Sequence, residues 1–238
     1  MDKLTKILIY ITVFLIPSYL IRFSILGIPT NILEILIYLT FISWILEKQK
    51  VSWNRLFQEY KIYIFSVLLI FLGLILSTLI NKNYQGGFGI IKGWFFDPLL
   101  FSFILIHKIK DLKDIENILK TFYFSAFVVS LVAIEYFFYG HLSYDGRLSA
   151  FWSSPNYLAM FLAPAIFIGI YILKSNKQKT KSKNITMIFS LAIVAFIIYL
   201  THSYSTWISI FLGLLIIELI TKKINTKNII IFSLVISL

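Results

Sequence analysis

One polar stretch between two long apolar blocks contains residues suited to binding a phosphate group. Arg147 follows Asp145-Gly146, a pair typical of a tight turn, and Pro155 suits the first turn of the helix that comes next. A guanidinium beside the free N–H groups of a helix N-terminus favours phosphate oxygens. We therefore expect Arg147 to bind an anion. The alternative is an interfacial Arg that reaches toward lipid headgroups.

A second group of polar residues lies inside an apolar block. Lys92 and Asp97 are five residues apart and Pro98 follows directly. A carboxylate within a bilayer is costly, so Asp97 should face the interior of a helix bundle and have a partner. The spacing is poor for one face of an α-helix, so we do not assume that Lys92 is that partner. Pro98 predicts a kink. Both a structural and a functional role for Asp97 fit this pattern.

Three histidines are present, and no two of them have the spacing of metal ligands. His202 is a candidate general base, with a plain interfacial residue as the alternative. The chain has no cysteine, which excludes thiolate metal sites and a Cys nucleophile. We expect neither a metal nor a cofactor.

The composition indicates a membrane protein. Of the 238 residues 59% are hydrophobic and only 14% are charged, which leaves too little polar surface for a soluble domain of this length. The formal net charge of +11 raises the question of nucleic acid. The Lys residues, however, stand in short clusters between apolar blocks, as expected of loops that face anionic lipid. We therefore expect membrane lipids, and no nucleic acid, as partners.

The elements that position the candidate residues are predicted to be transmembrane helices, each needing about 20 apolar residues. Eight blocks qualify, near residues 7–26, 31–46, 62–80, 88–106, 115–138, 155–173, 185–201 and 205–221. A ninth block begins at Asn228 and has eleven residues before the chain stops at Leu238. We predict an all-α polytopic transmembrane bundle of eight complete spans plus a truncated ninth. It forms one domain over 1–238, the N-terminal part of a longer protein.

The basic residues predict the orientation. With the N-terminus in the cytoplasm, the cytoplasmic segments hold 18 of the 22 Lys and Arg residues, and the other four are Arg22, Lys82, Lys92 and Arg147. This asymmetry is typical of cytoplasmic loops, and one missed helix would invert every later loop. It predicts a short outer loop over 139–154 and a basic cytoplasmic loop over 174–184.

The stretch Arg147–Ala159 (Arg-Leu-Ser-Ala-Phe-Trp-Ser-Ser-Pro-Asn-Tyr-Leu-Ala) resembles the O-antigen ligase and polymerase family of polysaccharide-assembly proteins. Those proteins commonly carry an Arg, a small-residue and aromatic stretch, and Asn-Pro-Asn before an apolar helix; here Ser154 replaces the first Asn. Leu200–Trp207 (Leu-Thr-His-Ser-Tyr-Ser-Thr-Trp) is similar to the family's Leu-Thr-x-Ser-Arg-x-x-Trp, with Tyr204 in place of the Arg. That replacement weakens any role of the segment in holding phosphate. The segments 29–34 and 92–98 and the overall topology also look similar to the family.

The resemblance implies a glycosyltransferase in the bacterial cytoplasmic (inner) membrane. Such an enzyme takes a glycan from undecaprenyl diphosphate on the outer face and joins it to a hydroxyl of a glycan or lipid acceptor, without a metal. It implies that Arg147 binds the diphosphate, with Lys92 as a second cation, Asn156 as an orienting amide and Asp97 in the same binding region. The family's large outer loop, with a His that assists the acceptor, would follow the ninth span, so this chain is expected to be an incomplete catalytic unit.

Two other functions stay open. A transporter or flippase of a lipid-linked or anionic substrate would use Lys92, Asp97 and the kink at Pro98. A non-enzymatic scaffold in an envelope-assembly complex fits the missing Arg at Tyr204. Between ligase and polymerase the sequence does not choose.

Overall fold

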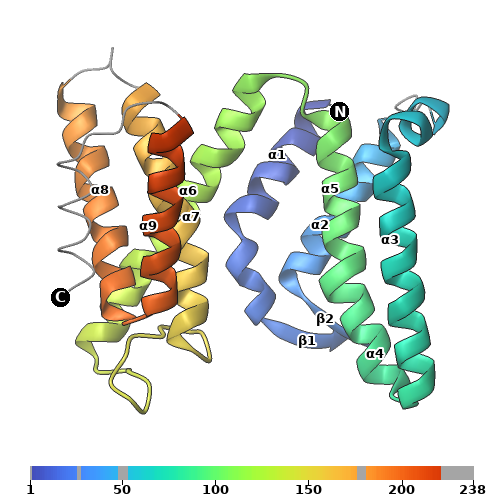
Figure 1. Ribbon diagram of the computed structural model, residues 1–238, viewed down its shortest axis with the longest axis horizontal. Coiled ribbons are helices and arrows are strands. Elements are labelled where there is room, and N and C mark those ends of the chain that lie inside the picture. The colour runs from blue at the N-terminus through green and yellow to red at the C-terminus, as the bar shows by residue number, and fades with distance from the viewer. Residues whose placement is uncertain (1, 26–27, 48–52, 176–180, 221–238) are drawn as a thin grey trace. The chain divides into compact units, whose positions relative to one another are not determined.

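The computed structural model describes residues 2–25, 28–47, 53–175 and 181–220 (Figure 1). These residues are mostly helical, as predicted, and the chain divides into two compact units, Met1–Glu116 (unit 1) and Asn117–Leu238 (unit 2).

In unit 1 the chain passes back and forth in successive helices (Figure 1). Its elements are α1 (Asp2–Phe14), the 3₁₀-helix η1 (Ile16–Leu20), β1 (Arg22–Ile25), β2 (Ile28–Asn31), α2 (Ile32–Leu46), α3 (Trp53–Asn81), α4 (Tyr84–Ile90), the π-helix η2 (Ile91–Phe96) and α5 (Asp97–Lys108). Helix α2 packs against both α1 and α5. Two hydroxyl pairs join α1 to α2, Thr5 to Ser43 at 2.7 Å and Thr12 to Thr40 at 3.2 Å between their side-chain oxygens. Such pairs satisfy polar groups that lipid could not.

The predicted first span, 7–26, is wrong in its second half. Helix α1 ends at Phe14, and Pro17 follows in the first turn of η1, because proline has no N–H to continue an α-helix. The chain then forms an antiparallel hairpin in which Arg22 pairs with Asn31, so the all-α prediction missed a two-stranded sheet. The hairpin leads directly into α2, where the Asn31 side chain accepts a 3.0 Å hydrogen bond from the Glu34 N–H and caps the helix.

The predicted span 88–106 lies within a run of helix from Tyr84 to Lys108, made of α4, η2 and α5. Where a kink was expected at Pro98, the chain forms one wide turn. In this turn the Asp97 N–H donates to the Lys92 carbonyl, five residues back. Pro98 then occupies the first turn of α5, where its missing N–H costs least.

Unit 2 contains most of α6 (Leu112–Phe138) and all of α7 (Pro155–Ser175), α8 (Lys181–Leu200) and α9 (Tyr204–Ile220). Helix α7 packs against α8 and α9. Gly169 of α7 allows a close approach, since a Cβ there would lie 2.7 Å from Leu191 Cδ1 and 2.8 Å from Tyr123 Cε2. The Tyr123 and Ser190 hydroxyls join α6 to α8 at 2.7 Å. These contacts fix the helices on either side of the loop 139–154.

Four helical runs are long and apolar enough to cross a membrane: Gln58–Asn81, Tyr84–Lys108, Leu112–Phe138 and Pro155–Ser175. Ile32–Leu46, Asn184–Leu200 and Tyr204–Ile220 are shorter apolar helices. The chain is therefore a membrane protein, as predicted. The predicted ninth segment, 228–238, lies outside the described residues, as does much of the predicted loop 174–184.

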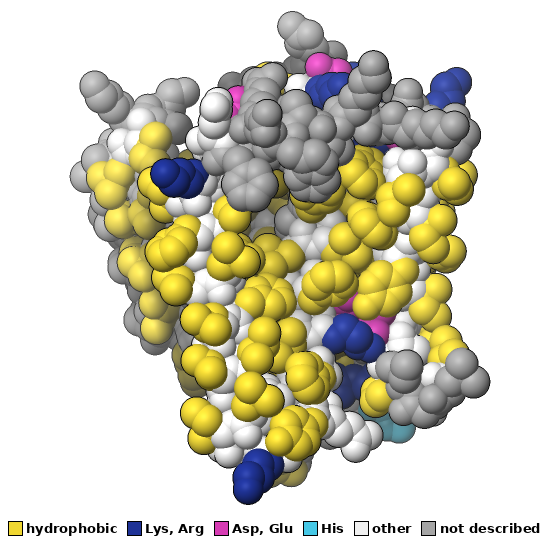
Figure 2. Space-filling view, turned by 90° about the vertical axis from the view of Figure 1, so that its right-hand side faces the viewer, with side chains coloured by type: hydrophobic (Ala, Val, Ile, Leu, Met, Phe, Trp, Pro, Cys, Tyr) yellow, Lys and Arg dark blue, Asp and Glu magenta, His cyan; other side chains and the backbone are white. Residues whose placement is uncertain are grey.

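Apolar side chains cover much of the face shown in Figure 2, and Lys and Arg side chains lie both near its ends and, beside acidic side chains, within it. Helix α3 is exposed along its apolar length, with Ile62 79% exposed and Leu68 62% exposed. An apolar surface of this kind is stable in lipid and unstable in water.

Candidate functional site

The predicted turn before Arg147 is present. The Gly146 N–H donates to the Ser143 carbonyl at 2.9 Å, and Gly146 has a φ of +76°, a conformation that suits glycine. The Ser143 N–H donates to the Arg147 carbonyl at 2.9 Å, and an antiparallel β-bridge pairs Leu142 with Leu148. The loop is therefore a small hairpin, and Arg147 lies in its second arm, just after the turn.

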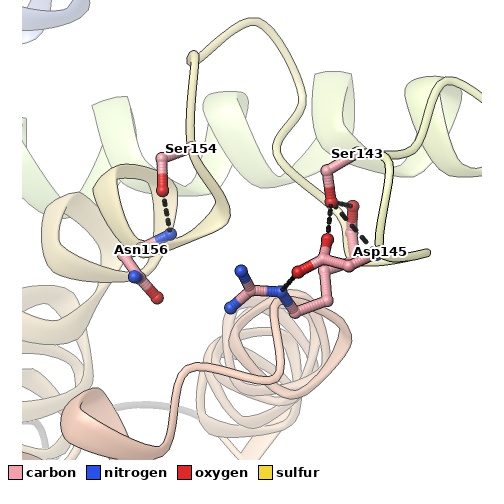
Figure 3. A network of polar contacts seen from close by, with 5 residues as sticks. Ser143, Asp145, Ser154 and Asn156 are labelled. Carbon is pink, nitrogen blue, oxygen red and sulfur yellow. Dashed lines mark hydrogen bonds and ion pairs between the residues drawn. The ribbon is translucent and has the colours of Figure 1, made fainter.

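Arg147 is held on one side of its guanidinium. Its Nε donates to Asp145 Oδ2 at 2.6 Å, and the Ser143 hydroxyl donates to Asp145 Oδ1 at 2.5 Å (Figure 3). The Ser143 hydrogen bond, followed by that of Arg147, lowers the pKa of Asp145, so this carboxylate is ionised at neutral pH. Within the described part of the chain, the terminal nitrogens of Arg147 have no hydrogen-bond partner. The two terminal nitrogens, with four N–H donors, therefore remain for a ligand.

The backbone next to Arg147 is anchored in the unit. The Leu148 N–H donates to the Leu200 carbonyl at 3.0 Å, and Leu148 is fully buried. Ala150 is also buried and has a φ of +48°, a costly conformation for a residue with a Cβ. The rings of Phe151 and Trp152 stack at 4.2 Å between centroids. These contacts hold the loop in place before any ligand binds.

Ser154 caps the start of α7. The Asn156 N–H donates to the Ser154 hydroxyl at 3.3 Å, and the Tyr157 N–H donates to the Ser154 carbonyl at 3.1 Å (Figure 3). Pro155 occupies the first position of the helix. Asn156 is exposed, and its side-chain amide has no hydrogen bond among the residues that the structure describes.

His202 lies in the connection between α8 and α9, two residues after the Leu200 carbonyl that receives Leu148. It is exposed, its φ is +46°, and its ring centroid lies 5.5 Å from that of Tyr199. The structure thus joins the two segments that carry the family resemblance, 147–159 and 200–207, through a backbone hydrogen bond. No feature of the sequence indicates that contact.

Lys92 and Asp97 form a separate cluster with α2. Lys92 Nζ lies 2.9 Å from Glu34 Oε2 and donates to the Pro29 carbonyl at 2.5 Å. The Tyr38 hydroxyl donates to Asp97 Oδ1 at 2.7 Å. Asp97 is 2% exposed, which confirms the predicted buried and partnered carboxylate. Lys92 pairs with Glu34.

Sequence reasoning did not connect Glu34 and Tyr38 with this cluster. Their spacing of four residues places them on one face of α2, which is the signal that could have found them. Lys92 and Asp97 belong to unit 1, whereas Arg147, Asn156 and His202 belong to unit 2. The expectation that Lys92 and Asp97 share a ligand with Arg147 stays a prediction.

Comparisons of the chain with models of protein families, with characterised proteins and with solved structures find no match.

Proposed function

We propose that this chain belongs to a membrane glycan ligase or polymerase, which transfers a glycan from undecaprenyl diphosphate to an acceptor hydroxyl on the outer face of the bacterial cytoplasmic membrane. One observation carries the proposal. Asp145 and the anchored Leu148 hold Arg147 in the loop that leads into α7, and its terminal nitrogens have no partner among the described residues.

The reaction needs a cation where charge develops. The acceptor oxygen forms a bond to the anomeric carbon while the bond from that carbon to the diphosphate oxygen breaks, and undecaprenyl diphosphate leaves as an anion. Arg147 stabilises that charge, because a guanidinium stays protonated and binds two phosphate oxygens at once. Asn156 is assigned to orient the glycan or diphosphate, and His202 to accept the proton of the acceptor hydroxyl.

Lys92 is less suited to the diphosphate than Arg147. Its ammonium already contacts the Glu34 carboxylate and the Pro29 carbonyl, so it would have to leave both to reach a phosphate. Asp97 is 2% exposed, so a diphosphate has little access to its carboxyl group. Within the proposed mechanism Arg147 is therefore the principal cation.

The proposal includes the topology: eight spans, a cytoplasmic N-terminus, loop 139–154 outside and loop 174–184 inside. The distribution of Lys and Arg supports it. Helix α2 has 15 residues, which at 1.5 Å each gives a length of about 22 Å, short of a hydrocarbon core of about 30 Å. The hairpin that precedes α2 would then lie near the outer boundary of the membrane.

The test uses the full-length protein, purified into lipid nanodiscs and supplied with radiolabelled undecaprenyl-diphosphate glycan and an acceptor. We expect label on the acceptor, release of undecaprenyl diphosphate, and no loss of turnover when a chelator is added. Movement of intact labelled lipid across a vesicle bilayer, without cleavage, would favour the transporter. If the protein neither transfers the glycan nor moves the lipid, the result favours the scaffold.

A further inference from the structure

The contacts between α2, η2 and α5 form a polar cluster inside unit 1, made of Glu34, Tyr38, Lys92 and Asp97. The wide turn of η2 helps to build it. The hydrogen bond from the Asp97 N–H to the Lys92 carbonyl spans five residues. In an α-helix Lys92 and Asp97 would point in different directions, whereas in this wider turn both side chains face α2. π-Helical turns of this kind are frequent at functional sites.

The charges of the cluster do not balance if every group is ionised. Glu34 and Lys92 contact each other at 2.9 Å and neutralise each other. Asp97 then remains as one uncompensated carboxylate at 2% exposure. A buried ion without a counter-ion is very costly, and in lipid more so, and such a group becomes neutral instead.

The hydrogen bonds of Asp97 lead to the same conclusion. Oδ1 accepts from Tyr38, but Oδ2 is buried and has no hydrogen-bond partner among the described residues. An ionised carboxylate accepts several hydrogen bonds, so a single donor leaves most of its capacity unused. The titratable groups that face Asp97 are Tyr38 and Glu34 from α2 and Lys92 from η2, and among the described residues neither α3 nor α4 adds another.

We propose that Asp97 is a reversible proton-binding site within the membrane part of unit 1. In the arrangement described here the carboxyl carries the proton and is neutral. Release gives the proton to water and leaves a carboxylate, for which Lys92 is the nearest available counter-ion. The site is independent of the glycan-transfer proposal, since it involves none of Arg147, Asn156 and His202.

Proton release would act on the hairpin. Lys92 bonds to the Pro29 carbonyl of β2, and Glu34 accepts a 2.8 Å hydrogen bond from Thr30 of the same strand. If Lys92 turns toward an ionised Asp97, the hairpin loses its contact with η2. The proton on Asp97 is therefore linked to the position of β2.

The test is infrared difference spectroscopy of the full-length protein in nanodiscs across a pH titration. We expect the C=O stretch of a neutral carboxylic acid at neutral pH, lost on raising the pH, and absent in Asp97→Asn. The matched control is Asp111→Asn, at an exposed carboxylate between α5 and α6, which should keep the band. A wild-type protein without the band, or a band that survives in Asp97→Asn and disappears in Glu34→Gln, would overturn the proposal.

Two further measurements keep the test decisive if Asp97→Asn folds poorly. Tyr38→Phe keeps the ring and removes the hydrogen bond, so it should move the band to higher wavenumber, because a C=O that loses a hydrogen bond stiffens. Sodium chloride, compared with choline chloride at constant pH, should leave the band unchanged. Loss of the band with sodium alone would mean a sodium site, and an unmoved band in Tyr38→Phe would mean a different carboxyl; either result contradicts the proposal.

Discussion

Replacing Arg147 by Lys is expected to lower the rate of glycan transfer by about 10²- to 10³-fold, the loss typical when a group that stabilises developing negative charge is removed. A Lys ammonium keeps the positive charge but is a point charge on a flexible stem, and it cannot present the two forked terminal nitrogens that Arg147 has free. The bond from Nε to Asp145 would also be lost. The measurement is turnover of labelled undecaprenyl-diphosphate glycan by the purified full-length variant.

Arg22→Lys is the matched control, because Arg22 is an exposed Arg in β1 and belongs to unit 1, whereas the loop belongs to unit 2. It should transfer glycan at the wild-type rate. Near-wild-type turnover in Arg147→Lys would remove Arg147 from the site. An equal loss in both variants would show that the effect is not particular to this loop.

Replacing Lys108 by Met is expected to lower the free energy of unfolding by about 3–5 kcal/mol, the usual loss when one partner of a buried ion pair is removed. Lys108 Nζ, at the end of α5, contacts the Glu47 carboxylate at the end of α2, and the two side chains are 5% and 2% exposed. Aromatic rings of Trp44 and Phe103 lie nearby on the same two helices, 5.3 Å apart between centroids. The variant leaves a buried carboxylate without its cation. Unfolding in a titration with denaturing detergent measures the change.

Lys110→Met is the control, since Lys110 is exposed two residues further on, and it should change stability little. The double variant Glu47→Leu with Lys108→Met should recover most of the lost stability, because it removes both charges together. A double variant as unstable as the single one would contradict this account of the pair.

The sequence predicted the helices well and their local irregularities poorly. Long apolar blocks define helices such as α3, α6 and α7 because a bilayer demands about 20 apolar residues in a row. The hairpin of β1 and β2 was missed because Ile and Phe continue the apolar block beyond Pro17, so hydropathy alone does not show where the helix ends. The π-helix was missed for a similar reason, since one wide turn leaves no mark in an apolar pattern.

In the candidate site, too, some features could be predicted from the sequence and others could not. The turn at Asp145-Gly146 and the cap at Ser154 could be predicted because local backbone chemistry determines both. The hydrogen bond from Leu148 to Leu200 could not, because it joins residues about 50 positions apart and depends on how the helices pack. Lys92 is the clearest example of a contact that the sequence does not predict, because its partner Glu34 lies on another helix. The ion pair with Glu34 makes the Lys92 ammonium less available to a ligand.

The central claim is that the loop bearing Arg147 lies on the outer face of the cytoplasmic membrane, where a lipid-linked diphosphate can reach it. Because the chain has no native cysteine, a single introduced thiol reports the side on which its residue lies. Tyr144→Cys, at the exposed tip of the loop, and Lys113→Cys, at the exposed start of α6, are to be treated in intact cells with a membrane-impermeant maleimide. The account predicts labelling of position 144 at once and of position 113 only after the cells are permeabilised, and the reverse pattern would contradict it.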